Sequence, residues 1–276
     1  HGSVFNQRIR DRICDLSKTL AAAESTEEFM KDMVQFYKDF GVGKLGLHKA
    51  FRVGHDENDN VEIQPITRIA HVKLEDLVGY EIPKQKLIEN TEAFVRGRKA
   101  NNCLLFGDAG TGKSSSIKGI LNRYYDEGLR IIEVYKHQFQ DLNDVIAQIK
   151  NRNYKFILYM DDLSFEEFEI EYKYLKAVIE GGLEKKPDNI LIYATSNRRH
   201  LVREKSGDKL EVADDEDLHS SDTVQEKLSL VYRFGVRIYF GAPNKKEFQN
   251  IVTTLAERYG VTMPAEELLM KANAWE

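Results

Sequence analysis

One segment of the chain has the residue types and spacing that phosphate binding requires. Residues 107–114, Gly-Asp-Ala-Gly-Thr-Gly-Lys-Ser, match the P-loop pattern G-x-x-x-x-G-K-[ST] at every fixed position. The glycines let backbone N–H groups surround a phosphate. Lys113 can reach the β- and γ-phosphates, and the Ser114 hydroxyl can bind the Mg²⁺ that accompanies them. A glycine-rich turn without a ligand is the alternative, and the complete match disfavours it.

The residues on either side supply the elements that must hold this motif. Before it, residues 103–106 form a short apolar run, as in a buried parallel strand. After it, apolar residues recur at positions 117, 120, 121 and 124, the spacing of a helix with one apolar face. The motif is therefore predicted to join a strand to a helix N-terminus, where the helix dipole favours an anion.

Two aspartates follow a second apolar run and could serve a metal ion and a water molecule. The run 156–160 ends in Asp161 and Asp162. We expect this strand to lie next to the P-loop strand, so that Asp161 can hold Mg²⁺. Asp162 could orient an attacking water molecule, and Glu166 is the alternative because it lies close by in the sequence. A pair of solvated turn aspartates is the competing interpretation.

The rest of the chain alternates between apolar runs and helical periodicity. This alternation predicts a three-layer α/β fold with a parallel sheet covered by helices on both faces. Residues 204–223 are polar and contain an acidic run, which predicts an exposed loop. Further strands are predicted at 131–134, 190–194 and 236–240, and helices at 83–97, 142–149 and 172–180.

The two ends of the chain are predicted to add helices to this core. Residues 4–72 read as two helices and a β-hairpin, residues 73–242 as the nucleotide-binding domain, and residues 243–276 as the start of a helical lid. Ser25 and Glu28 have the spacing of a capping box for the second helix. The apolar stripes of the first two helices are interpreted as packing faces, with docking of a partner as the alternative.

Composition narrows the possible surroundings and partners. The formal net charge is −5 and 31% of the residues are charged, so no overall basic field indicates nucleic acid. The two cysteines, Cys14 and Cys103, form no zinc-binding or disulfide pattern, which fits a reducing compartment. No apolar run approaches membrane-spanning length. We therefore expect a cytoplasmic protein without membrane contact.

Several motifs together resemble those of the AAA+ ATPases. Residues 76–79, 107–114, 161–162, 194–197 and 232–234 follow one another in the order that this family shows. The resemblance implies a P-loop NTPase fold with a five-stranded parallel sheet and a helical lid, which binds ATP or ADP with Mg²⁺. It also implies a homo-oligomer in which an arginine finger acts on the neighbouring subunit.

The resemblance also implies a role for each matching residue. Asp162 stands where the family usually has glutamate, and no clear sensor-2 arginine follows in the lid. The implied catalytic residues are Lys113, Asp162, Asn197 as sensor 1 and Arg233 as the finger, and Glu166 remains the alternative to Asp162 because it lies close by in the sequence. The implied metal ligands are Ser114 and Asp161. The implied nucleotide contacts come from Val78, Gly79, Gly107, Asp108, Ala109, Gly110, Thr111, Gly112, Lys113, Ser114 and Ser115.

A closer resemblance extends over about residues 70–270. The segments 161–166, 180–184, 194–201 and 226–230 look like those of an uncharacterised prokaryotic family of AAA+ ATP-binding proteins. We expect ATP hydrolysis on assembly, driving conformational work on a protein or nucleic-acid client. One alternative is an ATP-dependent binding switch or loader with slow turnover, which Asp162 and the unmatched sensor 2 favour. The other is a small-molecule P-loop kinase, which the acidic loop disfavours.

Overall fold

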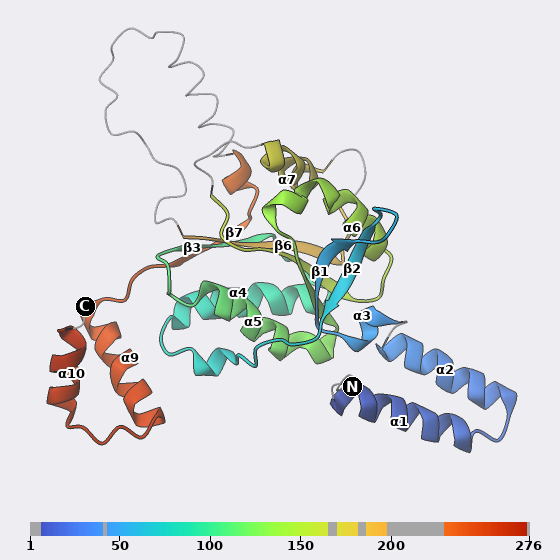
Figure 1. Cartoon of the computed structure of the whole chain (residues 1–276), viewed down its shortest axis with the longest axis horizontal. Helices are drawn as coiled ribbons and strands as arrows, with labels where there is room; N and C mark the ends of the chain where they lie inside the picture. The colour runs from blue at the N-terminus through green and yellow to red at the C-terminus, as the bar shows by residue number, and fades with distance from the viewer. Residues whose placement is uncertain (1–6, 41–42, 165–169, 182–185, 198–228, 275–276) are drawn as a thin grey trace, which may run out of the picture.

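A seven-stranded sheet forms the middle layer of the protein (Figure 1). The computed structural model describes residues 7–40, 43–164, 170–181, 186–197 and 229–274. The strand order is β2-β1-β4-β5-β6-β3-β7, and every neighbouring pair is parallel except β1 with β2. The strands are β1 Ala50–His55, β2 Val61–Ile66, β3 Cys103–Gly107, β4 Leu129–Glu133, β5 Lys155–Met160, β6 Ile190–Ser196 and β7 Val236–Phe240.

Helices cover both faces of this sheet and confirm the predicted three-layer α/β fold. In Figure 1, α4 and α5 lie below the sheet, and α6 and α7 lie above it. The helices are α1 Gln7–Ala22, α2 Thr26–Phe40, α3 Lys44–Leu47, α4 Glu81–Val95, α5 Lys113–Tyr124, α6 Leu142–Ile149, α7 Ile170–Glu180, α9 Lys245–Arg258 and α10 Ala265–Asn273. Residues 229–232 are also helical.

The buried strands explain why the sequence shows unbroken apolar runs. In β5, Phe156 and Leu158 pack on the α6–α7 side, whereas Ile157 packs on the α4–α5 side. All three side chains are fully buried. Because successive side chains point to opposite faces, a strand covered on both faces needs apolar residues at every position.

Two details of the sheet differ from the sequence-based expectation. The predicted five-strand core is present as β4-β5-β6-β3-β7, but the N-terminal hairpin adds β1 and β2, because β1 pairs with β4. The expectation that β5 lies next to the P-loop strand β3 is wrong, because β6 lies between them. Parallel strands are joined by crossovers, so the order along the chain does not fix the order in the sheet.

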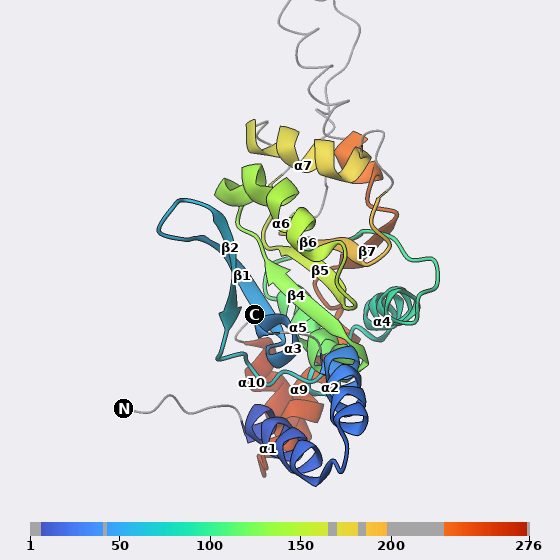
Figure 2. The ribbon, with the colours of Figure 1, turned by 90° about the vertical axis from the view of Figure 1, so that its right-hand side faces the viewer.

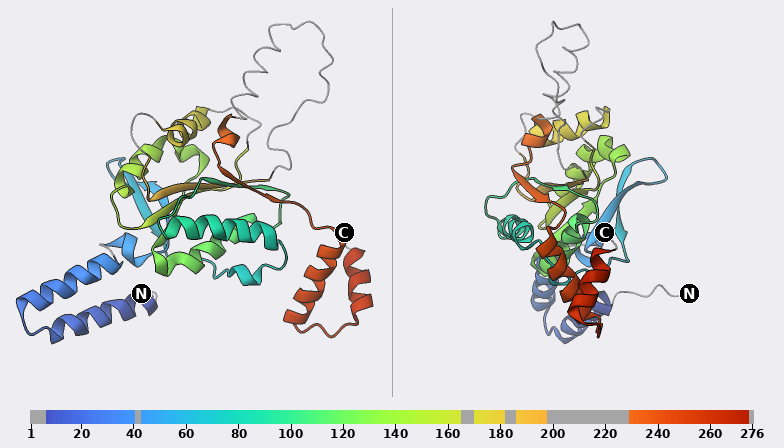
Figure 3. Two further views of the ribbon diagram at one scale, coloured as in Figure 1. Left: turned by 180° about the vertical axis from the view of Figure 1, so that it is seen from behind. Right: turned by 90° about the vertical axis from the view of Figure 1, so that its left-hand side faces the viewer.

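Two helical hairpins extend from opposite ends of the molecule (Figures 1 and 3), and they overlap in the view along its longest axis (Figure 2). α1 and α2 form one, and the Ser25 hydroxyl accepts the Glu28 N–H at 3.1 Å, as its predicted capping role requires. α9 and α10 form the other, and Asn244 caps α9 by accepting the Glu247 N–H at 3.0 Å. Across the described residues, no helix combines the length and apolarity that crossing a membrane requires.

The last glycine of β3 gives a stability prediction. Gly107 has φ 137°, and a Cβ atom there would lie 2.1 Å from the Phe240 carbonyl oxygen. Gly107→Ala should therefore lower the free energy of unfolding by roughly 3 kcal/mol or more. Gly97→Ala is the control, because Gly97 has φ 70° with open space around it, so only about 1–2 kcal/mol of backbone strain is expected. Urea unfolding of both variants measures the difference, and equal losses would contradict the predicted steric contact.

Candidate active site

The P-loop lies at the carboxyl end of β3, as its flanking sequence predicts. Gly112 has φ 89° and directly precedes α5, and Lys113 is the first residue of that helix. The Lys113 side chain is only 4% exposed, and its Nζ donates to the carbonyl oxygens of Gly107 at 3.4 Å and Asp108 at 2.5 Å. The ammonium group is therefore folded back onto the loop that precedes it.

Asp161 lies beside the first turn of α5. The Ser114 hydroxyl donates to Asp161 Oδ1 at 2.9 Å, so the two residues with metal-binding chemistry are in direct contact. The same oxygen accepts hydrogen bonds from the hydroxyls of Tyr159 at 2.7 Å and Thr195 at 2.5 Å. Three donors from α5, β5 and β6 thus converge on one carboxylate oxygen, although β6 separates β5 from β3.

These contacts determine the charge states of the site. Burial acts to raise the pKa of Asp161, but hydrogen bonds from Thr195, Tyr159 and Ser114 outweigh it and hold that pKa below its usual value. Burial lowers the pKa of Lys113, and the negative charges of nearby aspartates oppose this effect. The donor set therefore favours an ionised Asp161, the form that an Mg²⁺ ligand must have.

Asp162 adopts a backbone conformation that is uncommon for a residue with a side chain. Its φ is 53°, in the left-handed region. Its N–H donates to Thr195 Oγ1 at 2.9 Å, and its Oδ1 accepts a hydrogen bond from the Asn197 side chain at 2.9 Å. The structure thus brings together the carboxylate predicted to orient water and the amide predicted to act as sensor 1.

A cavity of about 400 Å³ extends from the P-loop to helix α9. Two aromatic rings form part of its wall. They belong to Tyr80 and Phe240, which stack on each other with 5.5 Å between ring centroids. A Cβ atom at Gly79 would lie 3.3 Å from Ile251 of α9, so this glycine permits the close approach of α9. The lining includes Leu77, Val78, Tyr80, Lys84, Asp108, Ala109, Gly110, Thr111, Gly112, Ser116, Phe240, Phe248, Ile251 and Leu255.

Two further side chains, Asp108 and Arg258, connect the segments that surround the cavity. The Asp108 carboxylate accepts the Ala242 N–H at 2.7 Å, which ties the P-loop to the segment after β7. Arg258, near the end of α9, donates to the carbonyl oxygens of Glu75 at 2.8 Å and Asp76 at 2.9 Å. Helix α9 is therefore anchored to the segment before α4, whose residues line the same cavity.

The remaining predicted site residues are Ser115, Arg233 and Glu166. Ser115 lies half-buried in the first turn of α5. Arg233 precedes β7, is 52% exposed, and its Nη2 lies 3.4 Å from Glu180 Oε1 at the end of α7. Glu166, the alternative water-orienting residue, lies outside the described residues, as does the acidic loop 204–223.

The sequence reasoning missed several residues that shape the site. Tyr159 lies two positions before Asp161, so strand alternation places both on one face. Thr195 likewise lies two positions before Asn197. The contributions of Tyr80 and of the apolar face of α9 to the cavity had no sequence signal beyond helical periodicity. Strand periodicity could have identified Tyr159 and Thr195, but not their contact with a carboxylate.

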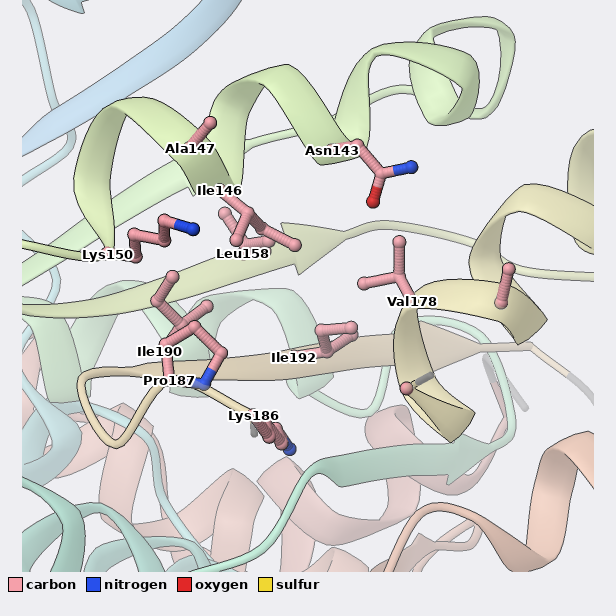
Figure 4. A pocket seen from close by; sticks show the side chains of 12 residues that line it. Asn143, Ile146, Ala147, Lys150, Leu158, Val178, Lys186, Pro187, Ile190 and Ile192 are labelled. Carbon is pink, nitrogen blue, oxygen red and sulfur yellow. The ribbon is translucent and has the colours of Figure 1, made fainter. Parts of the chain in front are cut away.

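A second cavity, of about 290 Å³, lies on the opposite face of the sheet, between α6 and α7 (Figure 4). Its floor is formed by Leu158, Ile190 and Ile192, and Ile146 and Val178 project into it from the two helices. None of the predicted site residues lines it. The candidate site is therefore the cavity at the P-loop.

A complete P-loop at the end of a parallel strand, with its serine bonded to an aspartate two strands away, defines the P-loop nucleotide-binding class of α/β proteins. This is the fold class that the AAA+ resemblance implies. The family model described as "Protein of unknown function (DUF815)" matches residues 47–276. The chain belongs to this family. No curated protein matches its sequence significantly.

Solved structures of RuvB from Thermotoga maritima share part of the architecture. The structure titled as the RuvB Holliday junction branch migration motor aligns with a TM-score of 0.47 and 18% identity, covering 73% of this chain. Two point mutants of the same protein align with TM-scores of 0.48 and 19% identity. The chain spans only 58% of the length of each of these three RuvB chains. The fold class given above rests on the sheet order and the P-loop, not on these alignments.

Proposed function

We propose that this protein binds ATP with Mg²⁺ and hydrolyses it when several copies assemble. The observation that carries the proposal is the 2.9 Å contact between Ser114 Oγ and Asp161 Oδ1 at the start of α5. In a P-loop site the serine hydroxyl and a strand-end aspartate serve the same metal ion, so these two groups must lie next to each other. Energy from the ATP cycle would drive a conformational change that acts on a protein or nucleic-acid client.

The residues present fit such a ligand. A Cβ atom at Gly110 or Gly112 would meet no atom within 4 Å, so the loop is open where a phosphate would lie. The cavity beyond it has apolar walls from Val78 and Ile251 that suit an adenine base. Mg²⁺ would be held by Ser114, Asp161 and phosphate oxygens, because these two side chains are already in direct contact, and it would neutralise charge on the phosphates.

Each polar side chain then has one task. Lys113 would exchange the carbonyl oxygens of its own loop for phosphate oxygens. Asp162 would accept a proton from the attacking water molecule. Asn197, which now donates to Asp162, would hold either that water or the γ-phosphate.

A binding switch with slow turnover is the second candidate, and one observation favours it. The Asp162 carboxylate is already engaged by Asn197 at 2.9 Å, and aspartate has a shorter reach than the glutamate usual at this position. A site arranged in this way can bind ATP while the water-orienting group stays occupied. The output would then be the occupancy of the site, not its turnover.

An assay of inorganic phosphate released from ATP distinguishes hydrolysis from a binding switch. If Asp162 is the base, Asp162→Asn should lower kcat about a hundredfold and leave the ATP dissociation constant within about threefold, since general-base catalysis contributes at least this much. Asp162→Glu is the matched control, because it keeps the carboxylate. A wild-type kcat no higher than that of Asp162→Asn, with ATP binding intact, would contradict hydrolysis through Asp162 and support the switch.

A further inference from the structure

Thr195 occupies the strand between the two halves of the candidate site. It lies near the end of β6, which separates the P-loop strand β3 from β5. Thr195 shares its face of the strand with Tyr193, which packs in the cluster formed with α4 and α5. The Thr195 side chain is only 2% exposed. Its hydroxyl is therefore buried on the α4–α5 side of the sheet, where it contacts both Asp161 and Asp162.

A single hydroxyl makes two different contacts at this position. It donates its only hydrogen to Asp161 Oδ1 at 2.5 Å and accepts the Asp162 N–H at 2.9 Å. The Thr195 carbonyl oxygen also accepts the Leu163 N–H at 2.8 Å. One residue thus contacts three consecutive residues of the turn that carries both carboxylates.

These contacts account for the conformation of that turn. Left-handed backbone is uncommon for residues other than glycine and persists where the surroundings fix it. Here the Asp162 N–H is fixed by Thr195 on one side, and the Asp162 carboxylate is bonded to Asn197 on the other. Without the hydroxyl, the turn would lose the contact that fixes Asp162 relative to Asp161.

We propose that Thr195 is a positioning residue for ATP turnover, whose hydroxyl sets the relative placement of the metal-side carboxylate of Asp161 and the water-side carboxylate of Asp162. The inference rests on the proposed function. It differs from the role of Tyr159, whose hydroxyl donates to Asp161 Oδ1 at 2.7 Å and, among the described residues, forms no hydrogen bond with Asp162. Loss of the Thr195 hydroxyl should therefore weaken Mg²⁺ binding and also slow the chemical step, whereas loss of the Tyr159 hydroxyl should weaken Mg²⁺ binding alone.

Three variants of the full chain test this difference. Thr195→Val keeps the shape and removes the hydroxyl, Thr195→Ser keeps the hydroxyl, and Tyr159→Phe removes a donor to Asp161 while leaving the Thr195 hydroxyl in contact with both aspartates. For each variant, Mg²⁺ is titrated against binding of a non-hydrolysable ATP analogue, and kcat is measured at low and at saturating Mg²⁺. Thermal unfolding in EDTA checks the fold, and Thr195→Ala replaces Thr195→Val if that variant unfolds.

The expected pattern is specific. Thr195→Val should need about tenfold more Mg²⁺ than the wild type for half-maximal binding of the analogue. Its kcat should remain about thirtyfold below the wild-type value even at saturating Mg²⁺. Both effects are on the scale of a lost hydrogen bond to a charged group. Tyr159→Phe should also need more Mg²⁺ but recover its kcat at saturation. Thr195→Ser should remain within about threefold of the wild type.

Two results would overturn the inference. One is a Thr195→Val protein with wild-type Mg²⁺ dependence and kcat. The other is a Thr195→Ser protein as impaired as Thr195→Val, because the methyl group and not the hydroxyl would then matter. A wild-type protein that binds the analogue with no effect of Mg²⁺, or not at all, would instead contradict the proposed function, and the inference with it.

Discussion

Lys113→Ala should weaken ATP binding at least about a hundredfold and abolish measurable hydrolysis. The Lys113 ammonium group is buried against the P-loop, where its Nζ contacts two loop carbonyl oxygens. Alanine removes the only lysine of the motif. Charged hydrogen bonds to a buried phosphate contribute about 1.5–3 kcal/mol each, and Lys113 can form more than one. Equilibrium titration with a fluorescent ATP analogue measures the loss.

The control for Lys113 is Lys86→Ala. Lys86 is exposed on the neighbouring helix α4, so its removal changes the net charge equally without touching the cavity lining. It should bind ATP within about twofold of the wild type. Equal weakening in both variants would indicate a general charge effect, and unchanged binding in Lys113→Ala would contradict nucleotide binding at the P-loop.

Arg233→Ala should lower kcat about a thousandfold while leaving ATP binding to the isolated chain within about threefold. The candidate site lies at the carboxyl ends of the parallel strands, whereas Arg233 precedes the opposite end of β7. The five residues of β7 span roughly 16 Å, so this side chain is remote from its own site. An arginine that neutralises charge on a transferred phosphoryl group contributes about 10³–10⁵ to kcat.

The present contact of Arg233 is compatible with such a role. Its ion pair with Glu180 is 3.4 Å long, and the two side chains are 52% and 31% exposed. An exposed pair of this kind contributes at most about 1 kcal/mol, so exchanging Glu180 for a phosphate of a neighbouring subunit costs little.

Mixing two inactive proteins tests whether Arg233 acts on a neighbour. Arg233→Ala has an intact P-loop, and Lys113→Ala has an intact arginine, so mixed assemblies would contain complete sites. Hydrolysis should therefore reappear when the two are combined. A mixture as inactive as its components, although it assembles, would contradict action between subunits.

Much of the fold follows from local patterns in the sequence. The apolar runs at β3 and β5 mark strands buried on both faces, and the periodicity after the P-loop marks α5. The cap at Ser25 was also predictable, because a side-chain cap depends only on residues within one turn. In each case the residues that determine the local structure lie within a few positions of one another in the sequence.

The arrangement of the site could not be predicted to the same extent. That β6 separates β5 from β3, and that β1 extends the sheet, depends on crossovers that the order of elements does not determine. The contact of Thr195 with Asp161 joins residues 34 positions apart and depends on strand register. The sequence motifs identified Asp161 and Ser114 by residue type. The 2.9 Å contact between Ser114 Oγ and Asp161 Oδ1 depends on the order of strands in the sheet.

ATP and Mg²⁺ should occupy the cavity at the P-loop together, and calorimetric titration can measure this joint binding. A non-hydrolysable ATP analogue is titrated into the full chain and into Asp161→Asn, each with Mg²⁺ and with EDTA. One analogue should bind per chain, Mg²⁺ should tighten binding to the wild type at least about tenfold, and Asp161→Asn should lose most of that gain. No saturable binding to the wild type under either condition would contradict this joint binding.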